Sequence, residues 1–146
     1  MARLESKEGR VLGVDFGDTR TGLALSDEVR FLASGIGYIS PGGIEKTADK
    51  IAEIAREQKA SAIVVGLPKN MDGSEGFRAE RCREFAQLLR ERLESIPVAM
   101  IDERLTTMSA SRYLNETNTR GQKRKGVIDT LSAQIILQNA LDRLKN

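Results

Sequence analysis

The chain has 146 residues, 40% of them hydrophobic and 30% charged, which is typical of a folded globular domain and not of a disordered chain. It contains one cysteine and no histidine, so an internal disulfide, a cysteine-based zinc site, a histidine base and a Ser–His or Cys–His triad are excluded. Any acid–base or metal chemistry must therefore rest on carboxylates.

Length and hydropathy predict one domain over residues 1–146. No apolar run is long enough to span a bilayer, and residues 1–10 are too polar for a secretory signal. We therefore expect a cytoplasmic protein with no membrane partner. The net charge of +2 gives no indication of other partners.

The first half of the chain predicts three strands and a helix. Residues 11–14 are an apolar run that ends at Asp15 and turns at Gly17, and residues 21–26 return as a second strand. Residues 33–40 form a third strand, interrupted by glycine. After a Pro-Gly-Gly break, residues 44–58 place apolar side chains on one helical face and charged side chains opposite.

The second half alternates strands with helices. Residues 61–67 are a continuous apolar run, typical of a strand buried on both faces, and residues 98–101 are a shorter strand. Helices are expected over residues 77–94, from residue 106 or 107 to 115, and from 127 to 144, with a polar loop over 116–126. This order predicts an α/β domain with a five-stranded mixed sheet, its first three strands antiparallel and helices on its faces.

Polar residues follow three of the predicted strands. They are Asp15 after the first, Lys69 and Asn70 after the fourth, and Asp102-Glu103 after the fifth. Right-handed crossovers bring the carboxyl ends of parallel strands to the same edge of the sheet, where ligands bind in α/β folds. The sequence therefore predicts one candidate site at this edge.

The last predicted helix adds a carboxylate, Asp129. Carboxylates that face one another need a compensating cation, and oxygen ligands favour Mg²⁺ or Mn²⁺. Two such ions can activate water and stabilise the leaving oxygen in phosphodiester cleavage. Each acid alone also has a structural explanation, as a turn residue or an ion-pair partner, so only their combination indicates a site. Small and apolar residues share the helical face of Asp129 and would let the helix lie close to the sheet: Ser132, Ala133, Ile136 and Ala140.

Basic residues cluster before the last predicted helix. Between residues 104 and 125 they are opposed only by Glu116. Such a cluster suits contact with a phosphate backbone, although a solvated loop would have the same composition. The candidate nucleic-acid-binding residues are five from this cluster and three near the strand ends: Arg104, Arg120, Lys123, Arg124, Lys125, Arg20, Lys69 and Asn70.

Four motifs occur in a fixed order along the chain. They are Gly13-Val14-Asp15-Phe16-Gly17 followed by Arg20-Thr21-Gly22, Val65-Gly66-Leu67-Pro68 followed by Asn70-Met71-Asp72-Gly73-Ser74-Glu75, Asp102-Glu103-Arg104-Leu105-Thr106-Thr107, and Asp129 before Ser132-Ala133. Together they resemble the motifs of the YqgF/RuvX family, from about residue 10 to residue 141. That family has an RNase H-like fold and is described both as Holliday junction resolvase and as pre-16S rRNA nuclease.

The resemblance implies that Asp15, Glu103 and Asp129 are the catalytic residues and bind one or two Mg²⁺ or Mn²⁺ ions. It also implies that the substrate is nucleic acid, pre-rRNA or branched DNA. Three positions depart from the family pattern: Lys69, Phe77 and Ser132. None of these departures removes an acid, so they concern substrate preference more than activity.

Several functional hypotheses remain open at this point. The first is a metal-dependent endonuclease acting on structured nucleic acid, in particular at the 5′ end of pre-16S rRNA in ribosome biogenesis, with the ribosome as a candidate partner. The second is a Holliday junction resolvase, which needs a two-fold dimer, whereas we expect a monomer or weak homodimer. The third is a non-catalytic nucleic-acid-binding module. The weakest is nucleotide binding, in which the turn at residues 15–22 would bind phosphate as in sugar kinases and actin-like ATPases. Those folds pair two such domains, and 146 residues supply only one.

Overall fold

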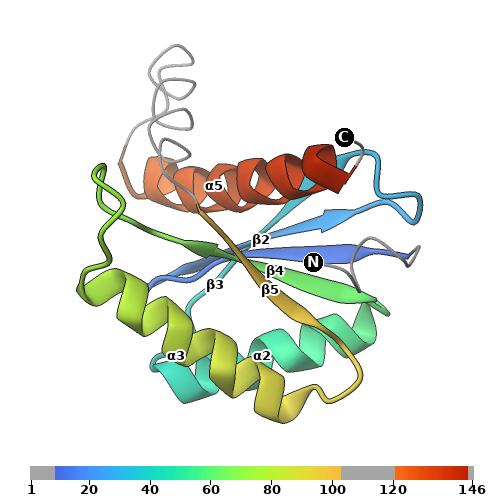
Figure 1. Ribbon diagram of the computed structural model, residues 1–146, viewed down its shortest axis with the longest axis horizontal. Helices are drawn as coiled ribbons and strands as arrows, with labels where there is room; N and C mark the ends of the chain where they lie inside the picture. Colours follow the sequence, from blue (N-terminus) through green and yellow to red (C-terminus); the bar gives the residue numbers. More distant parts are fainter. Residues whose placement is uncertain (1–8, 103–120, 145–146) are drawn as a thin grey trace.

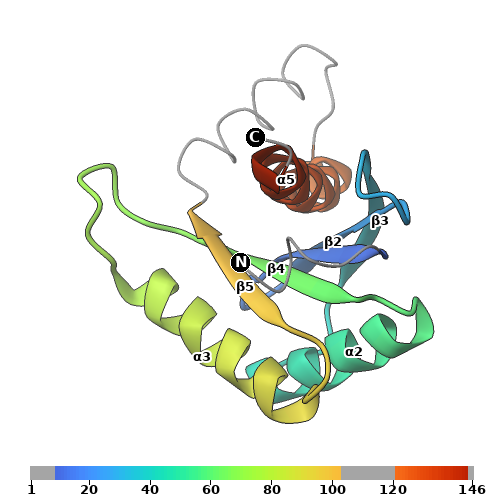
Figure 2. The ribbon, with the colours of Figure 1, turned by 45° about the vertical axis from the view of Figure 1, so that its right-hand side comes forward.

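A five-stranded sheet with helices on both faces forms the part of the chain that the computed structural model describes, residues 9–102 and 121–144 (Figure 1). α5 covers one face of the sheet, and α2 and α3 cover the other (Figure 2). The elements in chain order are β1 (Val11–Asp15), β2 (Thr21–Ser26), β3 (Ala33–Ile39), α2 (Ile44–Glu57), β4 (Ala62–Leu67), α3 (Phe77–Arg92), β5 (Val98–Asp102) and α5 (Gly121–Leu144).

The strand order in the sheet is β3-β2-β1-β4-β5. β1 pairs antiparallel with β2, and β2 with β3, whereas the β1–β4 and β4–β5 pairs are parallel. The predicted mixed sheet with its first three strands antiparallel is confirmed. The carboxyl ends of β1, β4 and β5 therefore lie along one edge of the sheet, which we call the carboxyl edge.

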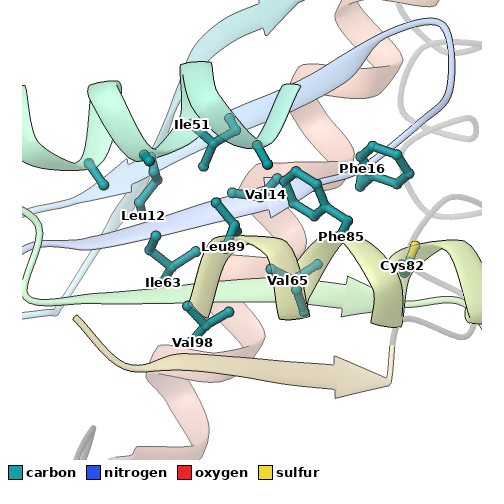
Figure 3. Close-up of a cluster of buried hydrophobic side chains, with 14 of the residues drawn as sticks. Leu12, Val14, Phe16, Ile51, Ile63, Val65, Cys82, Phe85, Leu89 and Val98 are labelled. Carbon is teal, nitrogen blue, oxygen red and sulfur yellow. The ribbon is translucent and has the colours of Figure 1, made fainter. Parts of the chain in front are cut away.

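The larger core lies between the sheet and the α2–α3 layer (Figure 3). Side chains alternate between the two faces of a strand, so Leu12 and Val14 of β1 point into this core and meet the apolar stripes of the two helices. Just beyond β1, Phe16 stacks on Phe85 of α3 with ring centroids 4.5 Å apart. Burial of such a side chain stabilises the fold by about 1.5–3 kcal/mol, and it holds the end of β1 in place.

α5 approaches the other face of the sheet closely because glycine faces it from β1, β2 and β3. A Cβ added to Gly13 would lie 2.7 Å from the Cβ of Leu137, and one added to Gly22 would overlap the backbone carbonyl of Asp129. Gly35 of β3 meets the helix in the same way. The face of α5 that is buried against these glycines carries the residues predicted for it: Ser132, Ala133, Ile136 and Ala140.

α5 begins at Gly121, so the prediction of a loop over residues 116–126 and of a helix start at 127 is wrong for residues 121–126. Glycines and charges suggested a loop, but glutamine, lysine and arginine are good helix formers. A glycine inside a helix costs only about 1 kcal/mol, which the packing of the rest of α5 outweighs. The helix predicted between residues 106 and 115 lies outside the described residues. No helix in the described part of the chain has the length and hydropathy needed to cross a membrane.

Candidate active site

Asp15 ends β1 at the carboxyl edge, on the α5 side of the sheet. Val11 belongs to the core under α5 and Gly13 meets that helix, so the two-residue period of a strand places Asp15 on the same face. The residue is half-buried and pairs across the antiparallel ladder with Gly22 of β2. Its carboxylate therefore extends from a strand end that the core holds rigidly.

Asp129 reaches the same place from α5. Its backbone carbonyl packs directly on Gly22, the ladder neighbour of Asp15. Gly22 is thus a shared neighbour of both acids, and any side chain at that position would push the helix away from the sheet. The backbone of Asp129 therefore lies next to the ladder neighbour of Asp15, although the two acids are far apart in the chain.

Asp129 forms an ion pair with Arg20, which precedes β2. Nε of Arg20 donates a hydrogen bond to Oδ2 of Asp129 at 2.7 Å, and the two side chains are only 25% and 22% exposed. Partial burial reduces screening by solvent and salt, so this pair interacts more strongly than a fully exposed one. Arg20 is a predicted nucleic-acid contact, and the structure brings it onto one of the predicted acids.

β5 ends beside β4 at the same edge. Leu67 pairs with Asp102 in the β4–β5 ladder, and β4 separates this end from Asp15 of β1. Ile101 packs in the core under α5, so the strand period places Asp102 on the opposite face. Glu103, the third predicted catalytic acid, follows directly in the sequence and lies outside the described residues.

Lys69 and Asn70 follow Pro68 at the start of the loop between β4 and α3. The backbone N–H of Asn70 donates to the carbonyl of Ser74 at 2.8 Å, and its side-chain amide donates to Oγ of Ser74 at 2.9 Å. The backbone N–H of Ser74 in turn donates to Oδ1 of Asp72 at 2.9 Å. Asn70 therefore shapes this loop at the carboxyl edge, in addition to its predicted contact with nucleic acid. Lys69 is half-buried at the base of the loop.

Sequence reasoning missed an arginine of α3 that also reaches this edge. Arg81 donates through Nε and Nη2 to Oδ1 of Asp18, at 3.2 and 2.9 Å, and through Nη1 to Glu84 at 2.9 Å. The hydrogen bond to Asp18 is the main reason that the pKa of Arg81 is raised above its ordinary value. Arg81 and Asp18 are 63 positions apart, so no local pattern could have indicated the contact. The glycines under α5 were missed too, although at least one glycine in each of three neighbouring strands was a usable signal.

The predicted basic cluster is only partly described. Lys123, Arg124 and Lys125 lie in the first turns of α5, on the same helix as Asp129 and ahead of it. Arg104 and Arg120 lie outside the described residues. α5 crosses the carboxyl edge where Asp129 lies on Gly22, and Leu137 lies further in, on Gly13. The turns of α5 that precede Asp129, which hold Lys123, Arg124 and Lys125, therefore extend outward from this edge.

The donor set suits a hard divalent ion in part. No group of three histidine, cysteine or acidic side chains that could hold a metal is found within residues 9–102 and 121–144. Asp15 and Asp129 carry carboxylates that could serve as two oxygen ligands, and the ion pair with Arg20 shows that a cation is accommodated against Asp129. A complete site of three acids would require Glu103. The chemistry of these donors fits Mg²⁺ or Mn²⁺ better than a softer metal.

Comparison with known sequences matches residues 9–143 to the family described as RuvX, Holliday junction resolvase. The chain is 42% identical over 136 residues to a protein of Ruminiclostridium cellulolyticum named "Putative pre-16S rRNA nuclease", which covers 92% of this chain and 95% of that protein. A Bacillus cereus protein of the same name is 44% identical over 138 residues, with 92% and 98% covered.

Comparison with solved structures finds nucleases of similar architecture. RuvC of T. thermophilus in complex with a Holliday junction substrate has a TM-score of 0.58 at 14% identity, covering 94% of this chain and 96% of that chain. The fowlpox virus resolvase in complex with Holliday junction DNA has a TM-score of 0.55 at 9% identity, covering 94% and 99%. These likenesses concern the fold alone, and they confirm the predicted RNase H-like architecture.

Proposed function

The chain belongs to the RuvX family, and from this premise we propose that it is a divalent-metal-dependent endonuclease that hydrolyses phosphodiester bonds in structured nucleic acid. One observation supports the proposal: the backbone of Asp129 in α5 packs on Gly22, which is the ladder partner of Asp15. Family membership supports nuclease activity, and the two acids are the part of the described structure best suited to it.

Asp15, Asp129 and Glu103 would hold one or two Mg²⁺ or Mn²⁺ ions. Such ions, when bound, supply an activated water and stabilise the charge on the leaving oxygen. Asp15 contributes a carboxylate fixed on a strand end, so its position changes little when substrate arrives. The role of Asp129 depends on how closely α5 lies on the sheet. Lys69 and the basic first turns of α5 would attract and orient the phosphate backbone.

We infer that the substrate is the precursor of 16S rRNA, cleaved at its 5′ end in the cytoplasm during ribosome biogenesis. The support is the name shared by relatives that are 42–44% identical over nearly their whole length. Base contacts play a smaller part than backbone contacts in this proposal, because the chain has only four phenylalanines, two tyrosines and no tryptophan.

The test compares Asp15→Asn with the wild type on a pre-16S rRNA fragment in Mg²⁺ or Mn²⁺, with a chelator as the metal-free reference. Loss of a direct ligand should lower the cleavage rate by at least about 100-fold, since outer-sphere changes alone cost 10–100-fold. Asp18→Asn is the matched control, because Asp18 lies near the same edge but binds Arg81. Equal cleavage by the wild type and Asp15→Asn would assign the activity to a contaminant and refute the proposal.

A second candidate function, resolution of four-way DNA junctions, is favoured by the description of the matching family. It uses the same acids but requires a two-fold dimer to make paired symmetric incisions. Sedimentation of the protein with and without a four-way junction distinguishes the two functions. A strict monomer that cleaves the RNA but not the junction excludes this candidate.

The same assays test a non-catalytic binding module. Such a module binds nucleic acid in a salt-sensitive way, independently of divalent ions, and cleaves neither substrate.

A further inference from the structure

We propose that Arg20 occupies the metal position at Asp129 when no divalent ion is bound, and that an ion must displace it to use this carboxylate. This inference rests on the proposed function, because it concerns the same candidate metal site. Arg20 and Asp129 are 109 positions apart in the chain and meet through a single short hydrogen bond of 2.7 Å from Nε to Oδ2.

The guanidinium of Arg20 and a divalent ion compete for the same carboxylate, that of Asp129. A carboxylate that accepts a charge-assisted hydrogen bond at this distance has committed one of its two oxygens. A divalent ion that takes that oxygen, or that lies against the same carboxylate, repels the guanidinium at close range. Partial burial of both side chains limits screening, so this repulsion is felt more strongly than at an open surface.

Displacement gives Arg20 a second role. Arg20 directly precedes β2, beside the turn that follows Asp15, so a displaced guanidinium remains at the carboxyl edge. It is then positioned to bind an oxygen of the incoming phosphate backbone, for which the planar guanidinium is well suited. Metal loading and the supply of a phosphate-binding group are thereby coupled, and such a coupling must act equally in both directions.

Other arginine–carboxylate pairs near this edge do not have this property. Arg81 binds Asp18 and Arg83 binds Glu75, and neither acid belongs to the predicted catalytic set. These pairs connect the β1–β2 turn and the β4–α3 loop to α3. Arg81 therefore provides a matched control, since removing it deletes the same charge and the same kind of bond near the same edge.

The experiment measures Mn²⁺ binding to the full chain by electron paramagnetic resonance and by calorimetry, with no substrate present. Arg20→Gln should lower the Kd for Mn²⁺ by about 5- to 20-fold, at the lower end of the range for coupled sites. Arg81→Gln should change it by less than about twofold. In an Asp129→Asn background, Arg20→Gln should have no effect, because the contact for which the ion competes is already gone.

An unchanged or higher Kd for Arg20→Gln would overturn the inference, and so would an equal decrease in Arg81→Gln, which would indicate a general charge effect. If Arg20→Gln does not fold, Arg20→Lys provides the test, because its point charge pairs less well with the carboxylate and should tighten Mn²⁺ binding by a smaller factor. The proposed metal site itself fails if the wild type and Asp15→Asn bind Mn²⁺ equally. If the wild type and Asp15→Asn differ in Mn²⁺ binding but Arg20→Gln does not bind Mn²⁺ more tightly than the wild type, only the inference about Arg20 fails.

Discussion

Gly22 shows how much one residue decides in this fold. It is the ladder partner of Asp15 and the contact point for the backbone of Asp129, so it sets the distance between α5 and the sheet. Gly22→Ala should destabilise the protein by about 1–3 kcal/mol, because a Cβ overlaps a backbone carbonyl that cannot move without the whole helix. Chemical denaturation monitored by circular dichroism measures the change.

Gly76→Ala is the control for that substitution. A Cβ added to Gly76 has its nearest neighbour 3.9 Å away, at the side-chain amide nitrogen of Asn70. The expected loss is below about 1 kcal/mol, mainly from replacing glycine at the N-cap of α3. Equal losses for the two variants would show that crowding at Gly22 is unimportant.

At the scale of elements, the ion pair between Arg83 and Glu75 attaches the β4–α3 loop to α3. Arg83 donates to both oxygens of Glu75 at 2.7 Å, and this hydrogen bonding is the main reason that the pKa of Glu75 lies below its ordinary value. A lowered carboxyl pKa means that the contact stabilises the folded state above the ordinary glutamate pKa of about 4.3 and that this stability is lost as the pH falls through the lowered value.

Arg83→Gln should therefore raise the pKa of Glu75 toward its ordinary value, as measured by NMR titration of the side-chain carboxyl carbon. Arg81→Gln serves as the comparison, because Arg81 binds Asp18 and Glu84 instead. A Glu75 titration that is the same in the wild type and in Arg83→Gln would contradict the structural explanation.

For the whole molecule, the distribution of charge matters more than the net charge of +2. α5, whose first turns are basic in sequence, lies on one face of the sheet, and α2 lies on the other (Figures 1 and 2). Replacing Lys123, Arg124 and Lys125 by glutamine should weaken RNA binding and reduce the slope of log K against log salt by about 2–3, if each contacts one phosphate. Fluorescence anisotropy in a chelator, which prevents cleavage, measures the slope.

Replacing Lys46, Lys50 and Arg56 of α2 by glutamine removes the same charge from the opposite face. This variant should bind RNA with nearly the wild-type salt slope. A similar reduction in both triple variants would mean that binding follows total charge and that no particular face of the protein contacts the RNA.

Most of the architecture could be predicted from the sequence. The apolar runs of β1 and β4 and the helical periodicity of α2 are local signals, because burial on one or both faces imposes a fixed spacing on apolar residues. The handedness of crossover connections then placed the ends of β1, β4 and β5 at one edge. The absence of histidine directed attention to carboxylates, and the small residues on α5 correctly indicated its close approach to the sheet.

The contacts between side chains of different elements could not be predicted in this way. The pairing of Arg20 with Asp129 and the contact of Gly22 with α5 depend on strand register and on where the helix crosses the sheet, which no local pattern encodes. The start of α5 at Gly121 could not be predicted from the sequence either. The later turns of the helix pack on the sheet, and this packing can stabilise helical structure in the earlier residues even where their own helix preference is weak. Spacing along the chain reports the burial of each element, whereas contacts between elements depend on how the whole chain packs.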